Sequence, residues 1–408
     1  MKKHLLALSA AAVLLAPQTV GAEGFSINEW SAEGFGMAGA RMFAENDAAN
    51  MAYNPASLTK VQGEKAKISV AYIAPHGKYK ADTGSAGDFS DPTFVEYGHN
   101  RVNPAFAPGM YYVKQLNDKE WIGMGTYARF GNMCQFERDS VVGSNAFSSR
   151  MNGVSLGLNY ARKHDNKWST SLGAEINYVG LQLDKNLAGV MPMHIEGTTW
   201  ALGWNAAANY AFDDKNEFGV VYRSKVKHSM EGNYDMHTAY NSTYGDVYGC
   251  VTLPENWMLG YGHKFNDKTR MELNATWTRW SRFDSFDMAV DGVLQQNPKH
   301  WKDGWRYAIG IEHKLSDKYT LLAGIAHDER SIPDETADFM VPTGERDTYT
   351  LGIQYHDKKQ TIAASFGYMD VGDLNMTGHK HGSTDRYSKA KMYDSYTKIV
   401  VLSYQYNF

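Results

Sequence analysis

The sequence predicts an all-β fold, a 14-stranded antiparallel transmembrane β-barrel with a small N-terminal α-helical hatch plugging the lumen. Three observations predict this fold. The last strand alternates apolar and polar residues and ends in Phe408, short turns recur six times along the chain, and an apolar leader before the first strand does not alternate. Together they predict a protein of the bacterial outer membrane.

The first 22 residues have the three parts of a cleaved signal peptide. Residues 1–4 are basic, residues 5–15 are apolar, and Val20, Gly21 and Ala22 form a small-residue cleavage site, so Glu23 is the expected first mature residue. No later run approaches the roughly 18 apolar residues of a membrane-spanning helix. The expected organisation is a signal peptide at 1–22, a hatch at 23–62 and a transmembrane barrel at 63–408.

The leader after the signal peptide is rich in Ala and Gly between residues 31 and 50, which predicts short helical pieces. Asn54, Pro55 and Ala56 predict a helix start, with Asn54 as the N-cap and Pro55 at the first helical position. Two locations are open for this leader, the lumen or the periplasm. Its aromatic and Met side chains would be sticky in water, which favours the lumen.

Six short turns rich in Asn, Asp and Lys follow, and each is flanked by alternating segments. They lie roughly 40 to 53 residues apart, enough for two strands of about 10 residues and a long loop. Asn and Asp favour such turns because they tolerate the left-handed backbone and bond to it. Six turns joining seven up-and-down pairs predict fourteen strands. The expected strands are 65–74, 105–114, 121–131, 151–162, 168–180, 200–211, 217–227, 253–265, 270–280, 304–314, 319–328, 348–356, 360–369 and 396–408.

The last expected strand shows two different faces. Leu402, Tyr404 and Phe408 fall on one face, and Ser403 and Gln405 fall on the other. This period-two alternation is typical of a strand with one apolar side. A carboxyl-terminal aromatic residue on such a strand is typical of outer-membrane barrels, and it predicts barrel closure and recognition by the barrel-assembly machinery.

The composition agrees with this class. The net charge is −4 and the mean hydropathy is −0.48, yet the chain contains 26 Tyr, 10 Trp and 38 Gly. Barrels combine these properties because each strand turns apolar residues to lipid and polar ones inward, while Tyr and Trp form girdles. There is no basic domain or stripe, so a nucleic-acid partner is not expected.

Cys134 and Cys250 are the two cysteines, and both are expected in outward-facing loops. An exported protein can form a disulfide between them, and two free thiols are the alternative. The sequence has no His-Glu-x-x-His zinc helix and no Gly-x-Ser-x-Gly elbow. Two histidines at 379 and 381 are weak evidence for a metal. We therefore expect no enzyme activity, no metal and no cofactor.

The leader also resembles the amino-terminal hatch of the FadL/TodX family of outer-membrane channels for hydrophobic molecules. The matching stretches read GFSINE, AEGFG, DAA and NPA at 24–29, 32–36, 47–49 and 54–56. Further matches extend nearly to the end of the chain: GWNA, YRSKVK, LPE, WSRF, WKD, GIAHD and SFGYM at 203–206, 222–227, 253–255, 280–283, 301–303, 324–328 and 365–369. Members of this family are fourteen-stranded barrels with an internal hatch.

The resemblance implies a gate. In the family, a ligand leaves sideways through an opening made by an inward kink in the third strand. Gly131, at the end of the expected third strand, could permit that kink, and the resemblance places Asn54 of the hatch near it. The expected loop at 181–199 would capture hydrophobic ligands through Leu187, Val190, Met191 and Met193, since Met adapts to varied shapes. A loop packed on its own neighbours is the alternative.

The resemblance also implies a site for a fatty-acid carboxylate, since burying an unpaired charge is costly. Lys185 falls where fatty-acid channels of the family carry one basic residue. The second basic position falls near Asn297, and Lys299 lies two residues further on. Either Lys299 replaces the missing cation or the ligand is uncharged. A solvated loop lysine is the alternative for Lys185.

The predicted function is passive, ligand-gated uptake of hydrophobic molecules, chiefly long-chain fatty acids, by a monomer surrounded by outer-membrane lipids and lipopolysaccharide. An aromatic-hydrocarbon channel of the same family is the first alternative. A surface adhesin or receptor barrel is the second, and it should not need a hatch or internal apolar pockets.

Overall fold

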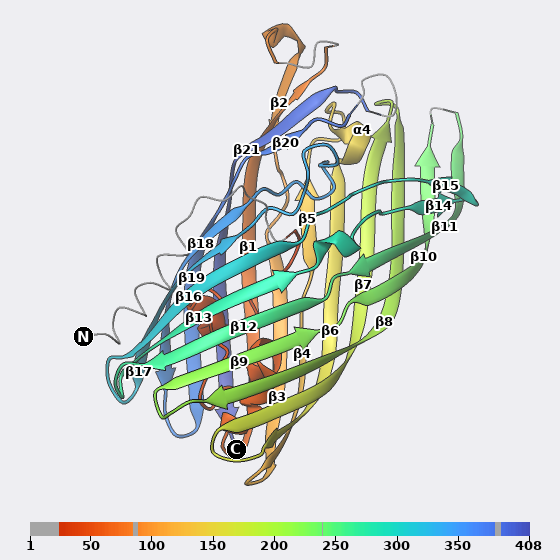
Figure 1. Cartoon of the computed structure of the whole chain (residues 1–408). Helices are drawn as coiled ribbons and strands as arrows, with labels where there is room; N and C mark the ends of the chain where they lie inside the picture. Colours follow the sequence, from red (N-terminus) through yellow and green to blue (C-terminus); the bar gives the residue numbers. More distant parts are fainter. Residues whose placement is uncertain (1–23, 85–88, 239, 380–384) are drawn as a thin grey trace.

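The computed structural model describes residues 24–84, 89–238, 240–379 and 385–408. Within them, fourteen antiparallel strands close into one barrel, in agreement with the strand number predicted from the turns (Figure 1). The expected signal peptide at 1–22 and its cleavage site before Glu23 lie outside the described residues. Among the helices described, none is long and apolar enough to cross a membrane.

Neighbouring barrel strands pair in chain order, and the first and last close the ring. The barrel strands are β1 (Glu64–Asp82), β3 (Ala105–Asn117), β4 (Glu120–Tyr127), β6 (Ser148–Lys163), β7 (Trp168–Leu187), β8 (Met191–Ala211), β9 (Asn216–Arg223), β12 (Asn256–Lys264), β13 (Thr269–Thr278), β16 (Gly304–Lys314), β17 (Tyr319–Asp328), β18 (Arg346–His356), β19 (Gln360–Val371) and β21 (Lys389–Asn407). The strands predicted at 304–314 and 319–328 coincide with β16 and β17.

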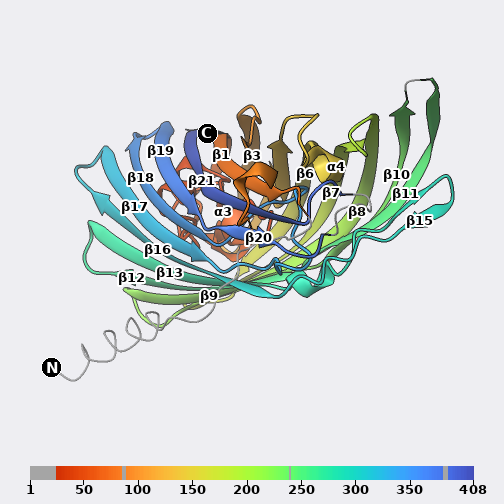
Figure 2. The same cartoon turned by 90° about the horizontal axis from the view of Figure 1, so that it is seen from above.

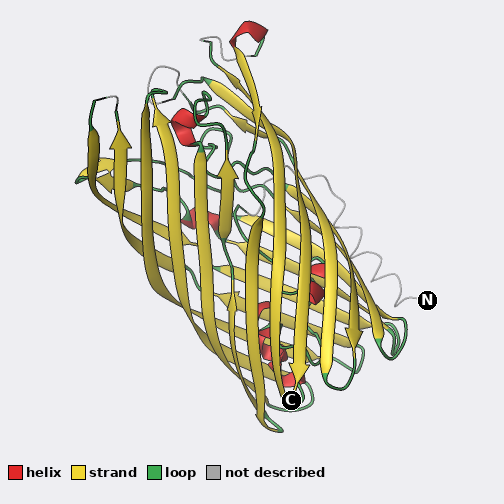
Figure 3. Cartoon of the chain, turned by 180° about the vertical axis from the view of Figure 1, so that it is seen from behind, coloured by secondary structure: helices red, strands yellow, loops and turns green. Residues whose placement is uncertain are grey.

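Shorter elements extend the barrel at the end opposite the carboxyl terminus or lie inside it (Figure 3). The strands are β2 (Val95–His99), β5 (Gly131–Gln135), β10 (Val226–His237), β11 (Ser242–Leu253), β14 (Met288–Val290), β15 (Val293–Gln295) and β20 (Leu374–Met376). The helical turns are α2 (Ala32–Gly36), α3 (Asn50–Tyr53), η2 (Pro55–Lys60), η3 (Pro92–Phe94), α4 (Gly143–Ala146) and η4 (Trp280–Arg282).

The last strand confirms the two faces predicted from its alternation. β21 pairs with β1 from Lys65↔Asn407 onward, and with β19 on its other side. Leu402 is 51% exposed on the outer wall, whereas Ser403 is 5% exposed and faces the lumen. The outer wall is therefore apolar, as lipid contact requires, and the inner wall is polar.

The six short turns have the chemistry that their residues predict. Asn117 accepts a hydrogen bond from the backbone N–H of Lys119 at 2.9 Å, and Asp165 accepts one from Lys167 at 2.7 Å. The corresponding bonds recur in the turns at 213–216, 266–269, 316–319 and 357–360. All six turns lie at the end of the barrel near the carboxyl terminus (Figure 1). The longer connections lie at the opposite end, which is the outer-membrane arrangement.

Three predicted strands are interrupted. The strand expected at 121–131 is divided into β4 and β5 by residues 128–130, and the strand expected at 217–227 is divided into β9 and β10. The strand expected at 253–265 begins at Asn256, because Leu253 ends β11 and Pro254 follows it. Proline has no N–H to donate to a ladder, which explains the last interruption.

The amino-terminal segment, residues 24–63, lies inside the barrel (Figure 2). Most of its side chains are buried, including the charged Glu33, Arg41 and Asp47. Ala32 N–H donates to Ser403 Oγ at 2.8 Å, and Ala48 N–H donates to Gln405 Oε1 at 2.9 Å. The segment is therefore bound directly to inward-facing side chains of the barrel wall.

Candidate functional site

An apolar cluster lies in the lumen around Phe25. Its ring contacts Phe130 at a centroid distance of 5.9 Å, Trp280 at 4.8 Å, Phe283 at 5.5 Å and Trp301 at 5.6 Å. The same buried cluster extends through further Met, Val, Leu and aromatic side chains of the longer connections. We call the five rings of Phe25, Phe130, Trp280, Phe283 and Trp301 the aromatic cage. It provides an apolar surface inside the lumen.

The aromatic cage adjoins the break in the third barrel strand. β3 pairs with β4 only from Met110 onward, and the described residues show no ladder pairs between residues 105–109 of β3 and β5. The amino-terminal segment fills this break. Ile27 N–H donates to Arg129 O at 2.9 Å, Gly131 N–H donates to Phe25 O at 3.0 Å, and Trp30 Nε1 donates to Ala128 O at 2.5 Å.

Gly131 lies in this break, as expected for the kink, but its partner is not Asn54. A Cβ at Gly131 would lie 2.5 Å from Ile27 Cδ1, so residues 25–30 cover the position closely. Asn54 instead donates from Nδ2 to Asn209 Oδ1 of β8 at 2.7 Å. Its Oδ1 accepts from Ala56 N–H at 3.1 Å, and Pro55 occupies the first helical position. The predicted helix start is thus confirmed, as a 3-10 helix.

A buried ionic cluster lies on the inner wall next to the break. Glu175 of β7 pairs with Arg129 at 3.2 Å and with Arg223 at 2.6 Å. Tyr127 Oη and Asn205 Nδ2 donate to the same carboxylate at 2.8 and 3.0 Å. Arg223 also donates to Ala52 O of the amino-terminal segment at 2.5 Å. Alternation could have placed Arg129 and Tyr127 on the inner face, but no sequence pattern indicated that these residues meet Glu175.

A second ionic network fixes the amino-terminal segment nearer the short turns. Arg41 pairs with Asp47 at 3.2 Å and with Glu312 of β16 at 2.7 Å. Lys67 of β1 pairs with Asp47 at 2.5 Å and with Glu33 at 2.9 Å. Breaking such buried pairs one at a time costs about 3–5 kcal/mol. The network therefore opposes movement of this part of the segment.

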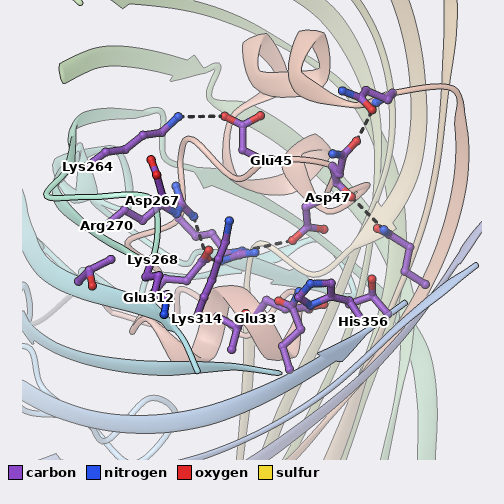
Figure 4. Close-up of a pocket in the computed structure, with 18 of the residues that line it drawn as sticks. Glu33, Glu45, Asp47, Lys264, Asp267, Lys268, Arg270, Glu312, Lys314 and His356 are labelled. Carbon is purple, nitrogen blue, oxygen red and sulfur yellow. Dashed lines mark hydrogen bonds and ion pairs between the residues drawn. The ribbon is translucent and has the colours of Figure 1, made fainter. Parts of the chain in front are cut away.

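A cavity opens among these charged residues and not at the aromatic cage. It has a volume of about 660 Å³ and is lined by Arg41, Asp47, Lys264, Arg270 and Glu312, among others (Figure 4). Lys264 reaches Glu45 across it at 3.5 Å. Its lining consists of charged and neutral polar side chains, so it suits water. We describe it as a hydrated vestibule at the short-turn end.

The two predicted head-group lysines, Lys185 and Lys299, lie near each other at the end of the barrel opposite the short turns. Lys299 is buried and hydrogen-bonds to Asp338. Lys185 lies seven residues beyond Tyr178, near the end of β7 at its turn with β8. Burial lowers the pKa of Lys185, and the nearby Lys299 lowers it further while Asp338 raises it. Sequence reasoning missed Asp338, which neutralises Lys299.

The loop predicted at 181–199 is instead the end of a long hairpin, and the capture role of its residues stays a prediction. β7 and β8 run through it, and Leu187 pairs with Met191 across a turn at 188–190. Beyond the membrane neither strand face meets lipid, so the alternation that marks a strand fades from the sequence. Val190 is 72% exposed at the turn, whereas Met193 packs against the apolar cluster.

Both cysteines are free thiols, and both lie in strands and not in the predicted loops. Cys134 is buried in β5, where its Sγ lies 3.1 Å from Phe339 O, and Cys250 is exposed in β11.

Comparison with known proteins gives a consistent result. Long-chain fatty acid transport proteins of Shigella flexneri and Escherichia coli K12 are each 26% identical, over 89% of this chain and 91% of theirs. Among solved structures, a FadL homologue of Pseudomonas aeruginosa has a TM-score of 0.84 at 19% identity, covering 94% of this chain and 100% of that one. The toluene transporter TodX of Pseudomonas putida has a TM-score of 0.72 at 16% identity, covering 93% and 99%.

These structural neighbours support the fold. The sequence profile of one family, described as "Outer membrane protein transport protein (OMPP1/FadL/TodX)", matches residues 12–408, nearly the whole chain. That family consists of transport channels for hydrophobic substrates and is not an enzyme class. The chain therefore belongs to the OMPP1/FadL/TodX family of outer-membrane transport proteins.

Proposed function

We propose that the chain conducts long-chain fatty acids inward across the outer membrane, passively and through apolar binding surfaces. The observation that supports this is the junction of the aromatic cage with the break between β4 and β5. An apolar chain gains about 0.8 kcal/mol per CH₂ when it leaves water for such a surface. A path of apolar surfaces is therefore favoured over a water-filled pore. Similarity to the long-chain fatty acid transport proteins of Shigella flexneri and Escherichia coli favours fatty acids as the substrate.

In this proposal residues 24–62 act as the hatch. Ligand first meets the protein at the rim, by which we mean the end of the barrel opposite the short turns. Met193 and Lys185 lie there beside the apolar cluster. It then reaches the aromatic cage, and it leaves sideways when residues 25–30 withdraw from the break. The ionic network around Arg41 and Lys67 keeps the rest of the hatch in place. The moving part is then the stretch that ends at Trp30.

A reversible disulfide across the break tests this function. Ser26 and Phe130 face each other as an isolated antiparallel pair, and the flanking hydrogen bonds, Ile27 N–H to Arg129 O and Gly131 N–H to Phe25 O, make it a non-hydrogen-bonded pair. The Cα atoms of such pairs lie about 4.5 Å apart, which a disulfide can bridge. Ser26→Cys with Phe130→Cys, in a background with both native cysteines changed to Ser, should lock residues 25–30 in the break.

Uptake of radiolabelled oleate by cells without another fatty-acid channel is the measurement. The oxidised double variant should take up little oleate, and reduction should restore uptake to the level of the Phe130→Cys single variant. Equal uptake in the oxidised and reduced states would show that residues 25–30 do not gate transport.

A neutral aromatic hydrocarbon is the second candidate substrate, because Asp338 already neutralises Lys299. Competition by toluene, with no competition by fatty acids, would favour it. A purely adhesive barrel should be indifferent to deletion of residues 23–60, whereas transport should change.

A further inference from the structure

The ionic cluster around Glu175 carries an excess of positive charge. Among the described residues, Arg129 and Arg223 share the carboxylate of Glu175. The other hydrogen-bond partners of these three side chains, Tyr127, Asn205 and the backbone carbonyls of Met51 and Ala52, are neutral. The side chains of Arg129 and Arg223 are 3% and 1% exposed. An uncompensated charge at such depth is costly, so the cluster favours a second anion.

Donor groups beside this cluster have no hydrogen-bond partner among the described residues. Arg129 uses Nη1 for Glu175, but its Nε and Nη2 are buried without a hydrogen bond. Both ring nitrogens of His228 in β10 are also without a partner, and the residue is fully buried. Asn177 Oδ1 accepts from Ser155 Oγ at 2.6 Å, while its Nδ2 has no acceptor. Buried polar groups are nearly always satisfied, so each of these groups needs an explanation.

The unpartnered groups lie on neighbouring strands and next to the aromatic cage. His228 lies close enough to Arg129 for the guanidinium charge to affect its imidazole. A Cβ placed on Gly203 would lie 3.1 Å from both Asn177 Nδ2 and Val226 Cγ2, and Val226 lies two residues before His228. The guanidinium of Arg129 lies over the ring of Phe130 at 5.3 Å, which connects the charged cluster to the cage. The indole nitrogens of Trp280 and Trp301 in the cage also have no hydrogen-bond partner in the part of the chain that the structure describes.

We propose that Arg129, His228 and Asn177 form an internal subsite for the carboxylate of an amphiphile whose hydrocarbon chain lies against the aromatic cage. The inference rests on the proposed function and narrows its substrate class to ionised acids. Arg129 offers two N–H groups to the two oxygens, the geometry in which guanidinium binds carboxylate best. Residues 25–30 cover this subsite, because Ile27 bonds to the backbone of Arg129. Their withdrawal would expose Arg129 and the break together.

The test compares two ligands of equal chain length. Oleate and oleyl alcohol share the hydrocarbon and differ in the charged end group. Binding of each to the full chain in detergent micelles is measured by quenching of tryptophan fluorescence. Arg129→Gln should weaken oleate binding about tenfold or more and leave oleyl alcohol nearly unchanged, since hydrogen bonds to charged groups carry that much affinity. Arg129→Lys should recover part of the loss. Arg150→Gln, at an exposed arginine of β6, is the matched control.

A second variant and a second measurement distinguish loss of the subsite from loss of the fold. His228 has no partner to lose, so His228→Phe should fold and still weaken oleate binding several-fold, as loss of one hydrogen bond does. The carboxyl ¹³C signal of labelled oleate should titrate at lower pH in the native protein than in Arg129→Gln, because a guanidinium favours the ionised form.

Unchanged oleate binding in Arg129→Gln, or equal weakening of both ligands, would overturn the subsite and leave the channel function standing. Failure of the native protein to bind either ligand would overturn the proposed function itself.

Discussion

Removing the charge of Glu175 should destabilise the barrel more than any other single carboxylate-to-amide change near the break. Its side chain is fully buried between Arg129 and Arg223, and Tyr127 and Asn205 also donate to it. Glu175→Gln keeps the volume but leaves two buried guanidiniums without a counter-charge. Loss of one partner of a buried ion pair costs about 3–5 kcal/mol. The folding equilibrium should therefore fall by a factor of roughly 100 to 5,000.

Urea unfolding of the barrel in lipid vesicles, followed by tryptophan fluorescence, measures this loss. Glu120→Gln is the matched control, because Glu120 makes an exposed 2.6 Å hydrogen bond with Tyr160 and should change stability by at most about 1 kcal/mol. Adding Arg129→Gln to Glu175→Gln should recover part of the stability, since one excess charge is removed. A loss in Glu175→Gln no larger than that in Glu120→Gln would refute the reasoning, and so would a further loss in the double variant.

Two further predictions concern the fit of the hatch and the rim. Gly324→Ala should displace the hatch and speed its proteolysis, because a Cβ there would lie 2.3 Å from the backbone carbon of Met37; Gly157→Ala, whose nearest neighbour would be 3.5 Å away, is the control, and equal proteolysis of the two would contradict the fit. Burial alone would lower the pKa of His379, but its 2.8 Å hydrogen bond with Asp385 raises the pKa above the usual value. The pair therefore stabilises the rim fully below about pH 6.5 and loses that contribution as pH rises through the raised pKa. An NMR titration midpoint for His379 at or below about 6.5, or one unchanged by Asp385→Asn, would contradict this assignment.

The barrel could be predicted from the sequence because its signals are local. A turn such as that at Asp165 needs only a side chain that bonds to the backbone two residues on, and a strand such as β17 needs only alternation. The break between β4 and β5 has no such signal. It depends on Ile27 and Trp30, which bond to strand residues about a hundred positions later in the chain.

The candidate site was less predictable for the same reason. Glu175 is separated from Arg129 by 46 positions and from Arg223 by 48. The alternation of a strand shows which residues face inward, but it does not show which inward-facing residues of different strands lie at the same level along the barrel axis. Lys185 and Lys299 were found through family resemblance, but their shared neighbour Asp338 lies on a connection without a recurring pattern. Charge balance in a lumen is therefore a property of the closed ring.

The contacts of Ser403 and Gln405 with Ala32 and Ala48 join the amino-terminal segment to β21. β21 also pairs with β1, so the strand that closes the ring carries side chains that bind the amino-terminal segment. A barrel that closed without this segment would leave Ser403 and Gln405 without these hydrogen-bond partners. We therefore expect the amino-terminal segment to enter the lumen before or while β21 closes the barrel.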